Sequence, residues 1–511
     1  MLDRFFLALA VFVPVVLAAS CSNDAEEPAP PQADYVKPTG GEVLAALPEG
    51  DVVMLRFSTN KDWTIEQPVV QQHFNGVLEQ RTGPAGDAEV PFVVVPNTTG
   101  ATRTTLMRIM AGRAQAEITV EQSPMDVELP AEDEVREYLI RLFNDTDGPN
   151  WRFRGNWCSD LPISQWGPEV KYENGRLSLI LGERELNGDI DLSGCKALVS
   201  IRCSKNRIGR LDVSDCPLLT SVDCINTGLE EINIKGCVSL SHLDVGYNSL
   251  RSIDVAGLKA LSQLSVNNCR LEKLDLSGCA SLTELNCAAN RLKTLEIPHR
   301  YRLMDCFCYE NEIGRLDLSD APQLQVMNCG DNEITELSVT GSPRLRWIYC
   351  YRNRLARLDI SGQKESLAHL YCFTNRLERI DVSGYRMLTE LNCSDNGLAQ
   401  LDVTDCRRLS WLYCSHNNLE SLDFTGIDTD CLSHLDCSYN RLREADIASL
   451  SLMRLWCQGN RIGGEIPEHF DRLLEFEHDA RYEYRPATGT YTDRGYGWWY
   501  PGEPDKMEHA R

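Results

Sequence analysis

One pattern of apolar and polar positions recurs about every 21 residues through most of the chain. Each unit reads L-x-x-L-x-C-x-x-N-x-L-x-x-L-D-V-S-x-C-x-x, as in the stretch that begins at Leu367. The alternation in L-x-C predicts a short strand that turns leucine and cysteine inward and the residue between them outward. The second half of the unit nearly repeats the first, so we expect short strands rather than helices on the opposite side too. The leucines that open successive units are Leu198, Leu219, Leu240, Leu261, Leu282, Leu303, Leu324, Leu345, Leu367, Leu388, Leu409, Leu432 and Leu452.

A single unit of this kind cannot bury its own leucines, whereas stacked units share a continuous core. The pattern resembles the leucine-rich repeat, in a bacterial 21-residue class that has cysteine in place of the third leucine. With a degenerate first coil at Leu177, the repeats cover residues 177–470 in about fourteen coils. The resemblance implies a solenoid with a parallel β-sheet on its concave side, and the fold class we predict is mainly β.

Residues 41–124 have short β-type runs separated by turn signals, which predicts a small immunoglobulin-like β-sandwich. The landmarks "FSTNKDW", "GPAG", "TRTT" and "ITVEQ" resemble a BACON domain, a module of Bacteroidetes surface proteins. That family is associated with carbohydrate and mucin binding, and it often serves only as a spacer. We therefore expect Trp63 to be a core residue, with a sugar platform as the alternative.

The first twenty residues place Arg4 ahead of an apolar run, as in a secretory signal peptide. The segment "LAASC" resembles the lipobox of bacterial lipoproteins, which implies lipidation of Cys21. Residues 21–40 are acidic and proline-rich and predict a disordered tether. We expect a lipoprotein of the outer membrane, exposed at the cell surface and held in the membrane through this anchor only. The alternative is a secreted protein with one odd cysteine.

The solenoid needs a cap at each end. Residues 125–176 combine an amphipathic helical pattern with Trp151, Trp157 and Trp166, and resemble the N-terminal cap of plant-like and Bacteroidetes leucine-rich repeat proteins. We expect the tryptophans to seal the first coil. Residues 471–511 are rich in aromatic and turn-forming residues and predict a C-terminal cap or tail.

Composition narrows the range of partners. Lys and Arg number 51 against 75 Asp and Glu, a formal charge of −24. A surface of this sign repels nucleic acid and anionic lipid headgroups, so we predict no nucleic-acid partner.

The cysteines of the strand position predict structure rather than chemistry. Val245 and Val266 take the same position in two coils, and valine cannot bind a metal or act as a nucleophile. In-register strands would also point the sulfurs in parallel, a strained arrangement for a disulfide. We predict free, buried thiols, with no metal and no cofactor. The eleven cysteines are Cys203, Cys224, Cys287, Cys308, Cys329, Cys350, Cys372, Cys393, Cys414, Cys437 and Cys457.

Two polar columns accompany the cysteines. The recurrent asparagine should satisfy backbone groups of adjoining loops through its amide. The recurrent aspartate of L-D-V-S stacks like charges, and arginines on nearby turns, including Arg207, Arg354 and Arg441, are plausible screening partners.

Function on such a scaffold must come from the side chains that project from the concave sheet. The first five coils carry polar residues there, and the later coils carry an aromatic field. Exposed aromatic residues are typical of contact sites, although they could instead pack on one another as a structural layer. The predicted ligand-binding residues are Phe307, Tyr309, Trp347, Tyr349, Tyr351, Tyr371, Phe373, Trp411, Tyr413 and Trp456.

No catalytic motif stands apart from the repeat, and His478 with Asp479 in "FEHDARYEY" fits a cap better than a dyad. We therefore predict no enzyme and no catalytic residues. The hypothesis is a non-catalytic surface protein that recognises an extracellular protein through its concave aromatic face. The alternative is capture of a glycan or mucin by the same face.

Overall fold

The computed structural model describes residues 33–67, 76–78, 80–428, 430–445, 450, 452–461 and 475–477. The predicted signal peptide, Cys21, His478, Asp479 and nearly all of the predicted C-terminal cap lie outside these residues. Within them, no helix is long and apolar enough to cross a bilayer.

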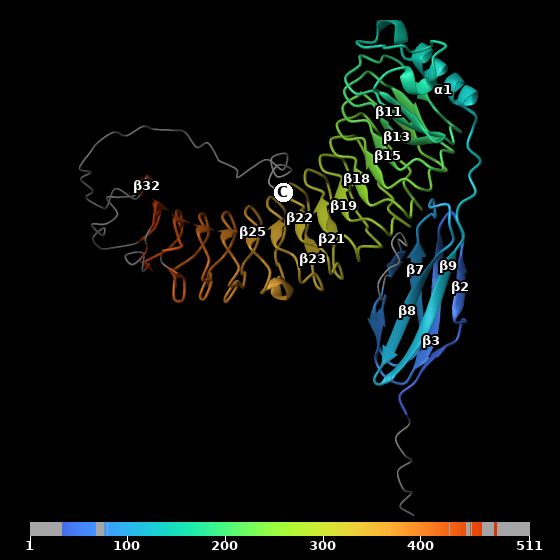
Figure 1. The fold of residues 1–511 in the computed structure, drawn as a ribbon. Helices are drawn as coiled ribbons and strands as arrows, with labels where there is room; N and C mark the ends of the chain where they lie inside the picture. Colours follow the sequence, from blue (N-terminus) through green and yellow to red (C-terminus); the bar gives the residue numbers. More distant parts are fainter. Residues whose placement is uncertain are drawn as a thin grey trace, which may run out of the picture.

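The N-terminal strands form two sheets that face each other across one core (Figure 1). In order, the first sheet is β1 (Val36–Pro38), β3 (Asp51–Thr59), β7 (Gly86–Val94) and β5 (Gly76–Leu78). The second is β2 (Val43–Ala46), β9 (Ala114–Gln122), β8 (Arg103–Ala111), β4 (Trp63–Glu66) and β6 (Thr82–Gly83).

The sandwich core contains the indole of Trp63, which is 3% exposed and meets the ring of Phe57 edge-on at 5.0 Å. The prediction of a core role for Trp63 is confirmed. The sheet begins earlier than expected, because β1 pairs with β3 and Asp34 accepts a hydrogen bond from the backbone N–H of Arg113 at 2.9 Å. The last residues of the predicted tether therefore belong to the sandwich.

A helix and a cluster of tryptophans close the N-terminal end of the solenoid. Helix α1 (Glu132–Asp145) has three acidic residues in its first turn, where they favour the positive end of the helix dipole. The rings of Trp151 and Trp157 pack at 4.9 Å, and that of Trp166 lies 5.5 Å from Trp157. All three are buried in the same core as the first coils, which confirms their predicted capping role. Two short 3-10 turns, η1 (Gly148–Asn150) and η2 (Ile163–Gln165), connect these elements.

The coils share one sheet of sixteen strands, parallel throughout except that β10 runs antiparallel to β11. Successive strands keep a constant register, so that equivalent residues of each coil lie side by side. The strands are β10 (Val170–Glu173), β11 (Arg176–Ile180), β13 (Leu198–Arg202), β15 (Ser221–Asp223), β17 (His242–Asp244), β18 (Gln263–Ser265), β19 (Glu284–Asn286), β20 (Asp305–Phe307), β22 (Val326–Asn328), β24 (Trp347–Tyr349), β25 (His369–Tyr371), β26 (Glu390–Asn392), β27 (Trp411–Tyr413), β29 (His434–Asp436), β31 (Arg454–Trp456) and β32 (Glu475–Glu477).

The opposite side of the coils also carries short strands, as the near-repeat within each unit predicts. Figure 1 shows β22 and β25 on the inner side of the curved array and β21 and β23 on its outer side. The outer strands are β12 (Ile190–Asp191), β14 (Arg210–Asp212), β16 (Glu231–Asn233), β21 (Arg315–Asp317), β23 (Glu336–Ser338), β28 (Ser421–Leu422) and β30 (Glu444–Ala445). One coil has the 3-10 turn η3 (Ser361–Gln363) on this side instead.

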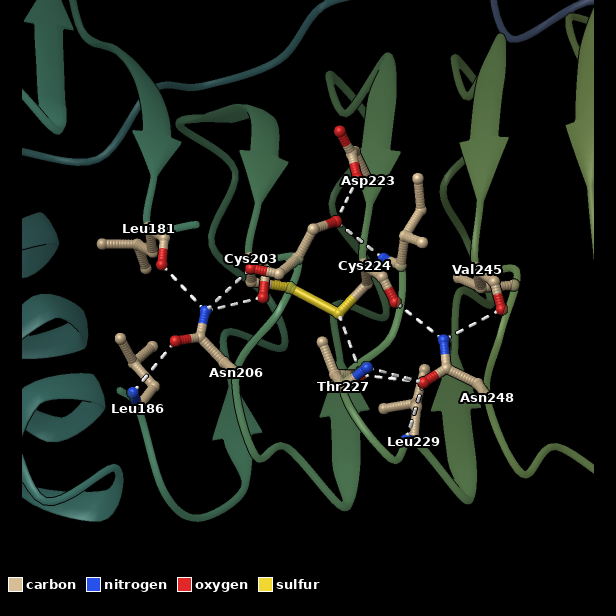
Figure 2. The surroundings of a disulfide bond; sticks show 12 residues. Leu181, Leu186, Cys203, Asn206, Asp223, Cys224, Thr227, Leu229, Val245 and Asn248 are labelled. Carbon is tan, nitrogen blue, oxygen red and sulfur yellow. Dashed lines mark hydrogen bonds between the residues drawn. A yellow bond between two sulfur atoms is a disulfide. The ribbon is translucent and has the colours of Figure 1, made fainter. Parts of the chain in front are cut away.

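The asparagine column joins each coil to the one before it. The amide nitrogen of Asn417 donates to the carbonyls of Cys414 in its own coil and Cys393 in the preceding one, at 3.2 and 3.0 Å. Its Oδ1 accepts from the backbone N–H of Leu398 at 3.0 Å. Figure 2 shows the same arrangement at Asn206 and Asn248. The predicted structural role of the asparagines is confirmed.

The strand-position cysteines are buried, as predicted, but one pair is oxidised. Cys203 and Cys224, in adjacent coils, form a disulfide with their Cα atoms 5.0 Å apart (Figure 2). The prediction of free thiols is wrong for this pair, because stacked strands bring the Cα atoms into the range that a disulfide spans. The other nine are free.

A second cysteine column, near the outer side, donates hydrogen bonds to the preceding coil. The Sγ of Cys237 donates to the carbonyl of Val213 at 3.0 Å, and that of Cys406 donates to Val382 at 3.0 Å. Where cysteine is absent, another donor often stands in its place. These stand-ins are Ser342, Gln363 and Tyr385, which donate to Leu318, Val339 and Ile360. Leu258 and Ala321 take this position without a side-chain donor, so the column favours a buried donor in most coils but not in all.

The carboxylates of the aspartate column accept hydrogen bonds within their own turns. Oδ1 of Asp317 accepts from the backbone N–H of Ser319 at 2.9 Å, and Asp402 and Asp423 accept equivalent bonds from Thr404 and Thr425. The predicted pairing is wrong for Arg354, which pairs with Glu333 at 2.8 Å. Two other arginines pair with the column instead: Arg210 with Asp212 at 3.2 Å and Arg300 with Asp317 at 3.5 Å.

The sandwich lies beside the solenoid and contacts three consecutive coils at one equivalent position (Figure 1). The ammonium of Lys259 donates to the carbonyl of Gly50 at 3.0 Å. One coil on, Ala280 is 1% exposed and packs with Val77 and Val93. In the third coil, the guanidinium of Arg81 lies 5.8 Å from the ring centre of Tyr301.

Candidate functional site

The concave face displays two side chains from each three-residue strand. In β24 the central Ile348 is buried, and Trp347 and Tyr349 project on the opposite face of the sheet. The parallel register places Trp347 beside His369 and Tyr349 beside Tyr371 of β25. The repeat length therefore decides which aromatic residues become neighbours.

Three aromatic pairs stack across β24 and β25. Trp347 and His369 have ring centres 5.7 Å apart and planes inclined by 11°. Tyr349 and Tyr371 lie at 5.0 Å with 24° between planes. Just beyond the strands, Tyr351 and Phe373 are almost parallel, at 4.9 Å and 4°. Pairs of this geometry add about 0.5–1.5 kcal/mol each beyond the area that they bury.

A glycine in the preceding coil makes room for this layer. A Cβ atom built at Gly330 would lie 2.4 Å from the ring of Tyr351, far inside van der Waals contact. The ring of Tyr351 therefore rests against the backbone of Gly330 and, through its stacked contact, against Phe373. The aromatic layer is thus held in place before any ligand arrives.

Strand β26 interrupts the aromatic residues with a polar strip, which consists of Glu390, Asn392 and Ser394. The Tyr371 hydroxyl donates to Oε2 of Glu390, and Nδ1 of His369 lies 3.4 Å from the same oxygen. Burial alone would raise the pKa of the Glu390 carboxyl, but the hydrogen bonds from His369 and Tyr371 outweigh it and lower this pKa. The carboxylate is therefore ionised at neutral pH.

The aromatic character resumes on the next strands. The indole of Trp411 packs against the ring of His434 at 4.9 Å and against the edge of Tyr413 at 6.5 Å. At the turns that follow these strands, His416 and Tyr439 stack at 4.4 Å, although both residues have a positive φ. The polar strip thus lies between two aromatic groups, one on β24 and β25 and the other on β27 and β29.

All ten predicted ligand-binding residues lie on the concave side, at or just beyond the strand ends. Nine of them are half-buried, and those on β24, β25 and β27 pack on one another, so the structural layer and the contact surface overlap. Tyr371 is 6% exposed and bonded to Glu390, so its main part is to support its neighbours. The half-buried residues are Phe307, Tyr309, Trp347, Tyr349, Tyr351, Phe373, Trp411, Tyr413 and Trp456.

The sequence reasoning missed Glu390. It occupies the same outward position as Trp347, His369 and Trp411, and the parallel register places it directly between the last two. The available signal was the interruption itself: one carboxylate in a row of aromatic and imidazole side chains.

A shallow hollow of about 440 Å³ lies beside the starts of the strands and is lined by Gln325, Arg346, Glu365 and Met387, among others. Within the part of the chain that the structure describes, no three histidine, cysteine or acidic side chains are grouped so as to hold a metal ion.

The chain is similar to two bacterial proteins of known structure. The functional domain of InlJ from Listeria monocytogenes, which is described as including a cysteine ladder, is 26% identical, with a TM-score of 0.55 over 59% of this chain and 67% of that chain. The leucine-rich effector YopM from Yersinia pestis is 24% identical, with a TM-score of 0.48 over 61% of this chain and 86% of that chain. No family model and no curated protein matches the sequence.

The repeat, the in-register parallel sheet and the likeness to InlJ define the fold as a parallel β-solenoid of the leucine-rich repeat type. A mainly β sandwich precedes it in the chain. In this chain, buried cysteines recur at one position after the strands of the shared sheet, with Val245 and Val266 as the two interruptions.

Proposed function

We propose that this protein binds an extracellular protein partner through the concave face of strands β20 to β31, while a lipid on Cys21 anchors it to the outer membrane. The observation that carries the proposal is the concentration of half-buried aromatic side chains on these strands. Aromatic residues of this kind, held rigid and partly desolvated, are typical of the residues that dominate binding energy at protein interfaces.

The stacking geometry favours a protein over a glycan. A sugar ring packs on the open face of an aromatic ring. In the stacked pairs on β24 and β25, each ring has a face covered by its partner in the pair. Their edges remain for contact, together with the half-buried amide of Asn392. A mixed surface of aromatic edges and polar groups suits the side chains and backbone of a protein.

The proposal can be tested by placing a photo-reactive amino acid at Asn392, on the concave face, and in a second variant at Arg386, on the exposed flank. On intact cells exposed to the surrounding proteins, we expect a discrete cross-linked protein from position 392 only. The added change Trp411→Ala should abolish it, because it removes the largest half-buried ring on β27.

The matched control for this substitution is Arg407→Ala, an exposed residue at the end of the preceding coil that lies away from the concave face. Equal cross-linking from both positions, or a product indifferent to Trp411→Ala, would contradict the proposal. Binding of the purified protein to a glycan array that is lost in Trp411→Ala would establish the glycan alternative instead.

A further inference from the structure

Among the described residues, only one of the two oxygens of the Glu390 carboxylate has a hydrogen-bond partner. Oε2 receives the Tyr371 hydroxyl and lies near His369, as described above. In the part of the chain that the structure describes, Oε1 accepts no hydrogen bond, and about a quarter (23%) of the side chain is exposed. A half-buried carboxylate with an unused oxygen gains most from a charged donor, since charge-assisted hydrogen bonds are about twice as strong as neutral ones.

The indole of Trp411 borders the same space. His434 packs on it from the side of β29, and the strand on its other side is β26, where Glu390 is its direct neighbour in the register. An aromatic face beside a carboxylate is suited to a flat cation that can stack and donate at once, and arginine combines both properties. The same packing already occurs on this face, because the guanidinium of Arg346 lies 4.7 Å from the ring centre of Trp347.

The charge of the concave face agrees with a basic partner. On the outward positions of β13 to β31, acidic residues outnumber basic ones. The acidic residues are Asp223, Asp244, Glu284, Asp305, Glu390 and Asp436, and the basic ones are Arg202 and Arg454. The whole chain carries a formal charge of −24. Such a field attracts a basic surface and increases its rate of association.

We propose that Glu390 and Trp411 form a subsite for an arginine side chain of the protein partner. The guanidinium stacks on the face of Trp411 turned toward β26 and donates to Oε1 of Glu390, while Tyr371 and His369 hold the carboxylate in place. This inference rests on the proposed function, since it names the chemistry of the partner at that surface. A lysine is a poorer fit, because an ammonium group cannot stack as a plane.

The subsite can be tested without knowing the partner. The mature protein, labelled with 15N-tryptophan, would be titrated with the peptide acetyl-Gly-Arg-Gly-amide, and the indole N–H signals would be followed by NMR. The signal of Trp411, assigned from Trp411→Phe, should shift on titration. The citrulline peptide, which has the same shape without the charge, should bind about tenfold more weakly or less.

The informative variant is Glu390→Gln, which retains an oxygen for the Tyr371 hydroxyl but removes the charge. We expect it to weaken the arginine peptide by about tenfold while the signal of Trp411 in the free protein stays near its original position. Glu284→Gln is the matched control, since it makes the same change at the equivalent position of β19, away from the aromatic field, and it should leave the titration unchanged.

Equal binding of the arginine, lysine and citrulline peptides, or full binding by Glu390→Gln, would overturn the arginine subsite. That failure is separable from failure of the proposed function. A partner cross-linked at position 392 that still depends on Trp411 would leave the binding face intact and remove only its arginine chemistry. The opposite outcome is also distinguishable. If the Trp411 signal responds to the arginine peptide but cross-linking does not depend on Trp411, the arginine subsite stands and the proposed function fails.

Discussion

The amide nitrogen of Asn417 lies 3.0 Å from the carbonyl oxygen of Cys393, one full coil earlier in the chain. The same side chain accepts the backbone N–H of Leu398, and it is 8% exposed. The substitution Asn417→Ala leaves these buried backbone groups unpaired, at about 1–3 kcal/mol for each group left unsatisfied. We expect a lower midpoint of urea unfolding and faster hydrogen exchange at the Leu398 amide.

The exposed Arg407, at the end of the preceding coil, gives the control for this change. Arg407→Ala removes a side chain of similar or larger size without removing a bond between coils, because its guanidinium pairs with Asp405 of the same turn. An Asn417→Ala protein as stable as Arg407→Ala would show that the amide is dispensable.

The two cysteine columns should respond in opposite ways to the same pair of substitutions. At Cys393, valine should be tolerated, because Val245 and Val266 occupy equivalent positions, whereas serine buries a hydroxyl in an apolar site. At Cys406, serine should be tolerated, because it keeps a donor for the carbonyl of Val382, whereas valine leaves that carbonyl unpaired.

Thermal unfolding of the four variants checks this reversal, with about 1 kcal/mol or more expected between valine and serine at each site. The same order of stability at both positions would mean that the second column, like the first, merely fills space.

Buried thiols should be unreactive in the folded protein. Burial raises the pKa of Cys350 and of Cys393 to about 12, so almost no thiolate is present at pH 8. Iodoacetamide at pH 8 should therefore modify the exposed Cys158 and spare these two until the protein is denatured. Cys203 and Cys224 should require a reductant as well. Mass spectrometry of the labelled peptides distinguishes the exposed thiol, the buried thiols and the disulfide-bonded pair. Rapid labelling of native Cys393 would contradict the packing described.

Acid should loosen the outer turns of the coils. Hydrogen bonds from Ser319 lower the pKa of Asp317 below its value in the unfolded chain. A depressed folded pKa means that the stabilisation is fully present above the unfolded value, about 3.9, and is lost as the pH falls through the folded value. Asp317→Asn should therefore make unfolding less dependent on pH below about 4. An unchanged acid profile in this variant would show that the turn does not sense protonation.

The contact between sandwich and solenoid should depend on Ala280. Arginine at this position cannot fit against Val77 and Val93, so Ala280→Arg should release the sandwich while both cores stay folded. Small-angle X-ray scattering should show a larger radius of gyration. Glu365→Arg makes the same addition at the equivalent, exposed position of a later coil and should leave the scattering unchanged.

The repeat itself could be predicted from the sequence in detail, because one apolar period of 21 residues dictates strand, register and core at the same time. The asparagine column and the sealing role of Trp151, Trp157 and Trp166 followed from the same logic. The disulfide between Cys203 and Cys224 could not be predicted in this way. The spacing of the Cα atoms permits a disulfide, whereas the parallel direction of the side chains disfavours it, and the repeat pattern does not say which effect is larger.

The sequence predicted which side chains lie on the concave surface, but not how these side chains contact one another. Reading outward positions identified Trp347, Tyr349 and Trp411, because alternation along a strand is a local property. That Tyr371 is covered and bonded to Glu390 depends on side-chain rotamers across two strands, which no period in the sequence encodes. The docking of the sandwich on Lys259, Ala280 and Tyr301 is likewise a long-range contact between dissimilar segments.

The asparagine column also gives the solenoid a direction. Each amide binds its own turn and the coil before it, as Asn353 does with Cys350 and Cys329, and Ile334 donates back to it. The loss of one asparagine therefore weakens the junction on its N-terminal side and spares that on its C-terminal side. In such a solenoid, a single asparagine substitution should allow two adjacent coils to separate and act as a hinge. The position of the substituted asparagine in the sequence gives the location of that hinge.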